Sequence, residues 1–320
     1  MAAPDLFDRS VLVVSGKGGV GKTVVAAACA RAATGRRRRV VLAEVEGRGG
    51  MSRLLGMPEA GFQERRTRFG YTAISITARE ALLEYLWLFF HMRTLARSLT
   101  KAKVVEVATD AIPGFRDVMI AGKLYELTGW RRASGPGHGR SPYDLVVVDA
   151  PPTGQLLPFL ESAGAYRELI RAGRPHRQLT AIDRLLREDS RIVLVAVPEE
   201  MSVTETLETA EALRKAGLTD PVIAVNQLLP PPFPKGTRAA GLRLEVPGLL
   251  DVLAEAGVRA DEQDAEELLK TVRDLDERHR EERRYVARLA RAGSVMELPF
   301  LFTPTFGPGE VDVLAERFAA

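Results

Sequence analysis

The sequence has one cysteine, Cys29, among its 320 residues. A single thiol provides neither a disulfide framework nor a Cys-x-x-Cys metal site, and we expect it to pack as a small core residue. Long apolar runs are also missing. The nearest, residues 81–90, is interrupted by Glu84 and is shorter than the roughly 18 residues that a membrane-spanning helix needs. The first ten residues lack the pattern of a secretory leader. We therefore expect a cytoplasmic protein that is not an integral membrane protein.

A strong charge imbalance is absent as well. The chain has 45 basic and 42 acidic residues, a net charge of +3, which gives no argument for nucleic-acid binding. The run of four arginines, 36–39, is interpreted as a solvated connection between a helix and a strand. Because 46% of the residues are hydrophobic, the chain can bury a full core. We expect a single domain over residues 1–320.

The most informative stretch is residues 11–24, VLVVSGKGGVGKTV. A β-branched run is followed by glycines and an Ala-rich helix, and Gly16, Gly21, Lys22 and Thr23 match the phosphate-binding pattern G-x-x-x-x-G-K-[ST]. Backbone N–H groups of such a loop close around phosphate oxygens at the positive end of the helix. Lys22 would reach the β- and γ-phosphates, and Thr23 would bind Mg²⁺. The expected nucleotide-binding residues are Gly16, Lys17, Gly18, Gly19, Val20, Gly21, Lys22, Thr23 and Val24.

Alternating strand and helix patterns predict a doubly wound α/β fold with a mostly parallel sheet, typical of a P-loop NTPase. Expected strands cover residues 11–14, 40–45, 71–76, 144–149, 192–197, 222–226 and 295–298. Helical patterns cover residues 24–33, 51–55, 156–187, 203–216, 249–292 and 311–318. Residues 79–130 are too long for one crossover helix, so we expect a helical insertion there. It contains Trp87, Phe89, Phe90, Met92, Met119 and Trp130. There is no internal repeat and no second P-loop.

Two polar residues close expected strands. Asp149 ends the apolar run DLVVVD, which is where P-loop NTPases hold Mg²⁺ through its water shell. Asn226 ends VIAVN, and its amide has both a donor and an acceptor that can pair with an adenine edge. A local turn made by the Asn side chain is the alternative.

These motifs resemble those of the ArsA family, which includes the ATPase that targets tail-anchored membrane proteins. Lys17 makes the loop G-K-G-G-V-G-K-T, the deviant P-loop shared with partition ATPases and nitrogenase iron protein. DAPPTG (149–154) resembles the family's switch II, D-T-A-P-T-G-H, with Gln155 at the histidine position. VNQLLP (225–230), PEEMSVTET (198–206) and the segment ending in MELPFL (296–301) are also similar to family motifs. The resemblance covers about residues 10–318.

The resemblance implies ATP and Mg²⁺ as cofactors and a dimer that encloses two nucleotides. Lys17 would cross the interface to the partner's nucleotide, with Lys22 stabilising charge at the γ-phosphate. Asn226 would read the adenine edge, and Pro299 and Phe300 would lie beside the base. Thr23 and Asp149 would be the metal-binding residues.

The expected switch I departs from the family. Where relatives have D-x-D-P-A-H, this chain has EVEGRGG, which places Glu46 at the acid that activates water. Glu46 can orient water, but its extra methylene shifts the carboxylate, and a small misplacement can cost about 10²-fold in rate. EVEGRGG resembles an actinobacterial branch with paired paralogues, which implies a heterodimer. The cysteines of the family's zinc clasp and arsenite site are missing.

Several functions remain open at this stage. One is an ATPase that opens and closes as a dimer and changes what the insertion exposes to a hydrophobic protein client or membrane-protein partner. Another is a slow or non-hydrolysing regulatory subunit paired with a paralogue. A third is a Min/Par-type partition ATPase, which the short acidic C-terminal segment 311–320 disfavours. The aromatic and Met residues of the insertion either line a client groove or form packed helix faces.

Overall fold

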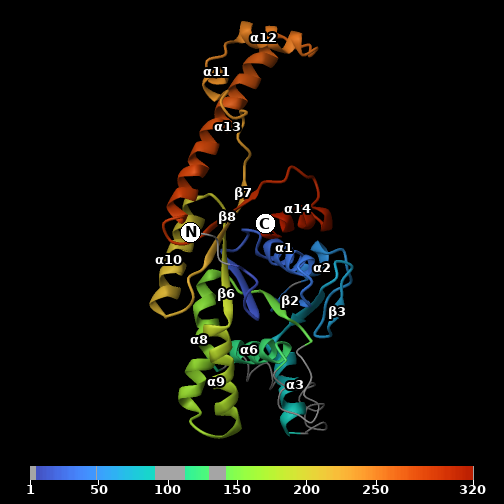
Figure 1. Cartoon of the computed structure of the whole chain (residues 1–320), viewed down its shortest axis with the longest axis vertical. Coiled ribbons are helices and arrows are strands. Elements are labelled where there is room, and N and C mark those ends of the chain that lie inside the picture. Colours follow the sequence, from blue (N-terminus) through green and yellow to red (C-terminus); the bar gives the residue numbers. More distant parts are fainter. Residues whose placement is uncertain (1–4, 48, 91–111, 130–141, 320) are drawn as a thin grey trace.

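The computed structural model describes residues 5–47, 49–90, 112–129 and 142–319. In these ranges an eight-stranded sheet has the order β3-β4-β2-β5-β1-β6-β7-β8, with helices on both faces (Figure 1). Every pairing is parallel except that of β3 with β4. The strands are β1 (Val11–Gly16), β2 (Val40–Val45), β3 (Arg65–Arg66), β4 (Thr72–Ile76), β5 (Leu145–Asp149), β6 (Ser190–Ala196), β7 (Val222–Leu228) and β8 (Val295–Pro299). The expected doubly wound, mostly parallel α/β fold is confirmed.

Both faces of the central strands are buried, which explains their nearly continuous apolar sequence. In β1, Leu12 and Val14 join the core cluster formed with α1 (Lys22–Gly35) and α14 (Pro308–Ala319). Val11 and Val13 join the opposite cluster, formed with α6 (Phe115–Leu127), α8 (Thr153–Leu169) and α9 (Gly173–Glu188). The alternation follows from the two-residue period of a strand.

The remaining helices connect or extend these layers. Sequence patterns located most of them, but the pattern over 156–187 is divided between α8 and α9. The division lies just before Gly173, whose φ of 83° favours glycine and turns the chain. The helices are α2 (Gly50–Leu54), α3 (Ala78–Phe90), α6 (Phe115–Leu127), α8 (Thr153–Leu169), α9 (Gly173–Glu188), α10 (Glu200–Lys215), α11 (Arg238–Leu242), α12 (Val246–Glu255) and α13 (Glu262–Leu289).

The described part of the expected insertion consists of α3 and α6. These helices contact one another, and α6 also packs on α8 and α9 (Figure 1). Met119 is partly buried against the core, whereas Trp87 is 42% exposed. Met92 and Trp130 lie outside the described residues, as do the side chains of Phe89 and Phe90.

A second helical projection extends from the opposite end of the sheet. It is formed by α11, α12 and the distal part of α13 (Figure 1). α13 has 28 residues, so it is about 42 Å long at 1.5 Å per residue. The sequence pattern over 249–292 missed the break between α12 and α13. The break is stabilised by a capping box in which Asp261 accepts a bond from the Asp264 backbone N–H and the Asp264 carboxylate accepts one in return.

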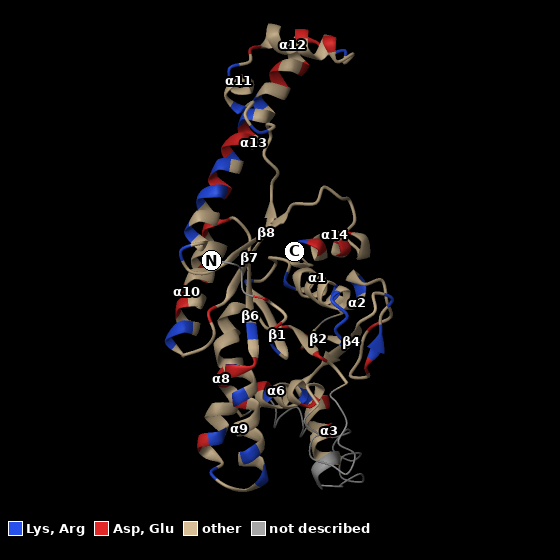
Figure 2. Cartoon of the chain, in the orientation of Figure 1, with Lys and Arg blue, Asp and Glu red and all other residues tan. Residues whose placement is uncertain are grey.

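Charged residues of both signs cover α13 (Figure 2). Two of the expected i,i+4 pairs are present, Arg280 with Asp276 at 3.1 Å and Arg278 with Glu282 at 3.5 Å. Arg238 of α11 also binds Asp276, with both oxygens within 2.7 Å of guanidinium nitrogens. Across the described residues, no helix is both long enough and apolar enough to span a bilayer.

Arginines of the run after α1 form contacts with other residues of the chain. Arg36 donates to Asp5 at 2.9 Å and lies over the ring of Phe7. Arg39 makes an ion pair of 2.6 Å with Asp144, just before β5. These contacts match the interpretation of the run as a connection between a helix and a strand.

Candidate functional site

The expected phosphate-binding loop connects β1 to α1 at the carboxyl edge of the sheet. Gly19 and Gly21 have φ values of 88° and 92°, in the left-handed region that favours glycine. A Cβ on Gly16 would lie 2.3 Å from the Val195 carbonyl oxygen, so the loop can leave β1 beside β6 only with glycine there. A Cβ on Gly18 or Gly19 would meet nothing within 4 Å, so the space beside this part of the loop is open.

Val20 and Val24 fix the loop to the core below it. Val20 is buried, and Val24 packs partly buried against the same cluster as α1. Lys22 is the first residue of α1, and its Nζ donates to the Lys17 carbonyl oxygen at 3.2 Å. Burial lowers the pKa of Lys22, while the charges of Asp149 and Glu205 act in the opposite direction.

The two expected metal-binding residues are in direct contact. Thr23 Oγ1 donates a 2.6 Å hydrogen bond to Asp149 Oδ2. β5 is paired with β1 so that Val14 lies opposite Asp149, which brings the end of β5 beside the P-loop. Burial raises the pKa of Asp149 to about 6, the bond from Thr23 opposes this rise, and the neighbouring Glu44 adds to it. A hydroxyl beside a carboxylate is an oxygen donor set of the kind that Mg²⁺ prefers.

Lys17 lies beside a residue to which the sequence assigned no role. Its Nζ is 3.9 Å from Oε2 of Glu205, on α10. Glu205 also accepts a hydrogen bond from Thr153, the first residue of α8. Glu205 thus connects the second P-loop lysine with the segment after Asp149. In the sequence, Glu205 was part of the segment PEEMSVTET, which resembles a family motif. That resemblance did not assign a chemical role to any residue of the segment.

Glu46 lies after β2 and is held by α3 and α6, the helices in the described part of the insertion. Its Oε1 accepts from the Ala78 backbone N–H, at the start of α3, at 2.9 Å. Its Oε2 is 3.1 Å from Nη2 of Arg116, in the first turn of α6. Glu46 itself has a φ of 49°, which L-residues rarely adopt. In this arrangement both carboxylate oxygens are engaged by the insertion, so the structure does not join Glu46 to the Thr23–Asp149 contact.

The expected base-binding residues lie at or near the carboxyl ends of β7 and β8. Asn226 Nδ2 donates to the Val20 carbonyl oxygen at 2.9 Å. A Cβ on Gly21 would lie 2.5 Å from that nitrogen, so glycine permits this approach. Because Nδ2 is engaged by the loop, the amide oxygen is the atom through which Asn226 can accept from an adenine amine.

Pro299 and Phe300 follow at the end of the neighbouring strand. Pro299 pairs with Leu228 across β7 and β8, and the Phe300 N–H donates to the Leu228 carbonyl oxygen at 2.8 Å. The Phe300 ring is 38% exposed and lies edge-on to Phe302, with centroids 4.9 Å apart. An exposed ring at the carboxyl edge of the sheet is available to stack against a base.

The single cysteine packs inside α1. Cys29 is fully buried and forms no disulfide, and burial raises the pKa of its thiol. Within the described ranges, no group of three or more His, Cys, Asp or Glu side chains is arranged to hold a metal ion. The metal-binding expectation therefore depends on Thr23 and Asp149.

The chain is similar to known ATPases. Residues 9–187 match the family model described as anion-transporting ATPase. ATPase BagA of Mycobacterium tuberculosis is 36% identical over 224 residues, which cover 68% of this chain and 65% of BagA, and a Mycobacterium bovis relative matches equally. Protein Rv2184c of M. tuberculosis is 27% identical over 262 residues, which cover 67% of this chain and 58% of that protein. This chain spans just under two thirds of the length of BagA.

The family match includes the P-loop, Glu46 and Asp149, whereas Asn226, Pro299 and Phe300 lie beyond it. The matched residues contain the first five strands of the chain and most of the helices around the expected phosphate and metal sites. The match covers more than half of the sequence. The chain belongs to the ArsA family of anion-transporting ATPases.

Proposed function

We propose that this chain binds and hydrolyses Mg-ATP as a dimeric switch. The observation that carries the proposal is the 2.6 Å contact between Thr23 and Asp149 beside the P-loop. It joins a hydroxyl at the start of α1 to a carboxylate at the end of β5, next to Lys22. Two segments far apart in the sequence therefore provide an oxygen donor set and a cation beside the P-loop.

The residues present fit the nucleotide and the ion. The open space beside Gly18 and Gly19 would receive the phosphates, with Lys22 beside the β- and γ-phosphates. Thr23 and Asp149 would hold Mg²⁺, which neutralises phosphate charge when bound. Asn226 would accept from the adenine amine, and Phe300 with Pro299 would cover the base.

Lys17 and Glu46 would complete the catalytic groups on closure. The Nζ of Lys17 lies 3.9 Å from Glu205. Because this ion pair is long and its ammonium is partly exposed, breaking it costs little free energy. Lys17 would then reach the nucleotide of a second subunit, either a second copy or a paralogue. Glu46 would orient the attacking water after leaving Arg116 and Ala78, so hydrolysis and movement of α3 and α6 would be linked. We place this cycle in the cytoplasm, with a hydrophobic client or membrane-protein partner.

A second function is favoured by the same geometry around Glu46. Both carboxylate oxygens are engaged by the insertion, and EVEGRGG replaces the family's usual switch I. The chain would then be a regulatory subunit that binds ATP but does not hydrolyse it at a useful rate, and its bound ATP would hold a paralogue in the closed dimer. The two functions differ in turnover by the isolated chain.

The test is steady-state Mg-ATP hydrolysis by the purified chain across a range of protein concentrations, with nucleotide binding measured in parallel. A rate per subunit that rises with concentration supports a self-sufficient homodimer. Binding without turnover supports the regulatory subunit.

Lys22→Ala is expected to lose nucleotide binding by about 100-fold or more, because it removes the cation at the phosphates. Lys215→Ala is the matched control, since Lys215 is exposed and pairs only with Glu211 on its own helix among the ion pairs of the described residues. Normal hydrolysis by Lys22→Ala would overturn the proposal.

A further inference from the structure

Glu205 is a carboxylate beside the P-loop to which the proposed function gives no role. It lies in the second turn of α10, with Oε2 3.9 Å from Nζ of Lys17. Its Oε1 accepts a hydrogen bond from Oγ1 of Thr153, at the start of α8. Burial lowers the pKa of Lys22, and Glu205 is one of the two carboxylates whose charge opposes that change. One side chain therefore interacts with both lysines of the P-loop and with the segment after Asp149.

The backbone that carries Glu205 is fixed by the packing of α10. Val203 and Thr206 are buried, and Oγ1 of Thr206 donates to the Ser202 carbonyl oxygen at 2.7 Å. One turn further, Oγ1 of Thr209 donates to the carbonyl oxygen of Glu205 itself, also at 2.7 Å. The helix therefore holds this carboxylate beside the P-loop independently of its contacts with the lysines.

A carboxylate at this position opposes the binding of an anion. Phosphates that enter the loop beside Lys17 and Lys22 bring several negative charges close to Glu205, and like charges repel. Lys17 must also leave Glu205 before its ammonium can contact a phosphate. Both costs grow with the charge that the ligand carries, so they are larger for a nucleoside triphosphate than for a diphosphate.

We propose that Glu205 is a positioning residue that competes with the γ-phosphate for Lys17 and thereby limits the preference of the site for a nucleoside triphosphate over a diphosphate. The inference rests on the nucleotide binding in the proposed function and not on hydrolysis. It therefore holds for the dimeric switch and for the regulatory subunit alike.

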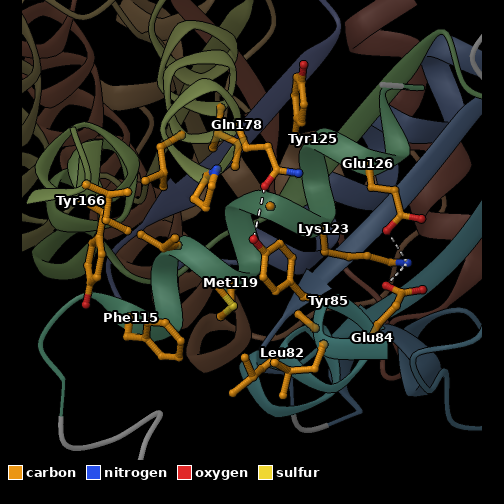
Figure 3. A pocket seen from close by; sticks show the side chains of 18 residues that line it. Leu82, Glu84, Tyr85, Phe115, Met119, Lys123, Tyr125, Glu126, Tyr166 and Gln178 are labelled. Atoms are coloured by element: carbon orange, nitrogen blue, oxygen red, sulfur yellow. Dashed lines mark hydrogen bonds and ion pairs between the residues drawn. The ribbon is translucent and has the colours of Figure 1, made fainter. Parts of the chain in front are cut away.

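The bond from Thr153 connects this competition with the helices of the insertion. Thr153 is the first residue of α8, which packs on α6 and α9. Together with α3, these helices surround a mostly apolar cavity of about 330 Å³ (Figure 3). Lys123 of α6 joins the insertion helices there, 2.7 Å from Glu84 of α3 and 3.3 Å from Glu126. A shift of Glu205 relative to Thr153 would therefore reach the insertion through α8.

The test measures dissociation constants of Mg-AMP-PNP and Mg-ADP by calorimetry on the full chain. Glu205→Gln removes the charge and keeps the side-chain size, and its amide oxygen can still accept from Thr153. This variant is expected to bind AMP-PNP about three- to tenfold more tightly and ADP less than about twofold more tightly. A residue that only supported the fold would weaken both nucleotides when changed. Glu208→Gln, an exposed position on the same helix, is the matched control and should leave both constants unchanged.

Two further variants locate the effect. Glu205→Asp keeps the charge and should bind AMP-PNP within about twofold of the parental protein. In a Lys17→Ala background the gain from Glu205→Gln should fall below about twofold, because the cation for which Glu205 competes is gone.

Several outcomes would overturn the inference. These are AMP-PNP binding by Glu205→Gln that is unchanged or weaker, an equal gain for ADP, the same gain in Glu205→Asp, or an undiminished gain without Lys17. Parental protein that binds neither nucleotide would overturn the proposed function together with this inference. Parental protein that binds both nucleotides, with the same constants in Glu205→Gln, would overturn this inference alone.

Discussion

Arg116 and Glu46 form an ion pair, with Nη2 and Oε2 3.1 Å apart, that joins the insertion to the segment after β2. Glu46 also accepts from the Ala78 N–H, so α3 and α6 hold one carboxylate together. These two contacts fix the carboxylate to α3 and α6, and we expect both to break when Glu46 orients water at a γ-phosphate. The pair therefore represents a resting arrangement if Glu46 is the catalytic acid.

Removing Arg116 is expected to raise ATP turnover. Arg116→Ala frees Oε2 of Glu46, and because a half-exposed ion pair is worth up to about 1 kcal/mol, we expect a two- to fivefold increase. Phosphate release at saturating Mg-ATP measures it. Arg184→Ala, which removes an exposed pair with Glu188 on α9, is the control. Turnover that stays at the parental value, or the same increase in a variant that also lacks Glu46, contradicts the resting arrangement.

The second P-loop lysine is predicted to act across a dimer interface. Lys17→Ala and Glu46→Ala should each bind ATP but hydrolyse it at least about 100-fold more slowly. In a mixed dimer, one site has an intact Glu46 and receives an intact Lys17 from the other subunit. A 1:1 mixture is therefore expected to recover up to about a quarter of parental turnover by random pairing. A mixture as inactive as its components would show that Lys17 acts within its own subunit or that no homodimer forms.

Asn226 is predicted to set the preference for adenine. Asn226→Ala removes the amide oxygen that would accept from the adenine amine, and a hydrogen bond of this kind is worth about 1 kcal/mol or more. The ratio of GTP to ATP dissociation constants should fall about five- to tenfold. The 2.9 Å bond to Val20 is lost as well, so the affinities for both nucleotides can drop, and the ratio is the informative quantity. An unchanged ratio of GTP to ATP dissociation constants would show that Asn226 only stabilises the P-loop and does not select the base.

The attachment of α11 to α13 is predicted to weaken in acid. Hydrogen bonds from Arg238 lower the pKa of Asp276 below its usual value of 3.8, with Arg280 contributing. A depressed carboxyl pKa stabilises the folded form above the unfolded pKa, and that contribution is lost as the pH falls from about 4 through the folded value. Amide exchange in residues 238–242 should therefore rise below about pH 4.

Asp276→Asn should raise that exchange already at neutral pH. Glu211→Gln is the control, because Glu211 also has a lowered pKa but pairs with Lys215 within one helix. Exchange in α11 that does not differ between parental protein and Asp276→Asn would show that the Arg238 pair does not hold the helix.

Local sequence determined the parts of the site that depend on backbone conformation. The spacing of Gly16, Gly21, Lys22 and Thr23 located the P-loop, because only glycine suits its left-handed angles and close approaches. Asp149 was located by its position at the end of an apolar strand. One strand, Val40–Val45, was predicted to the residue, and the other expected strands to within two residues at each end, because a strand buried on both faces leaves a continuous apolar run.

Sequence patterns were less informative where neighbours in space decide the outcome. Residues 249–292 were interpreted as one charged helical stretch, although α12 is largely apolar and α13 is strongly charged, and the packing of α12 on α13 joins residues from both sides of the break at Asp261. The two-residue strand β3 pairs antiparallel with β4 and has too few residues for a periodic signal.

The sequence by itself determined the family, the α/β fold and the phosphate-binding loop, because these follow from short-range spacing and apolar periodicity. Only the tertiary structure decided where the long side chains point. It placed Glu205 beside Lys17, Arg116 on Glu46, and Lys123 between two carboxylates in an apolar cavity. Apart from the contact of Lys123 with Glu126 on the same helix, each of these contacts joins residues that are distant in the chain, and their geometry depends on how the helices pack against a shared sheet.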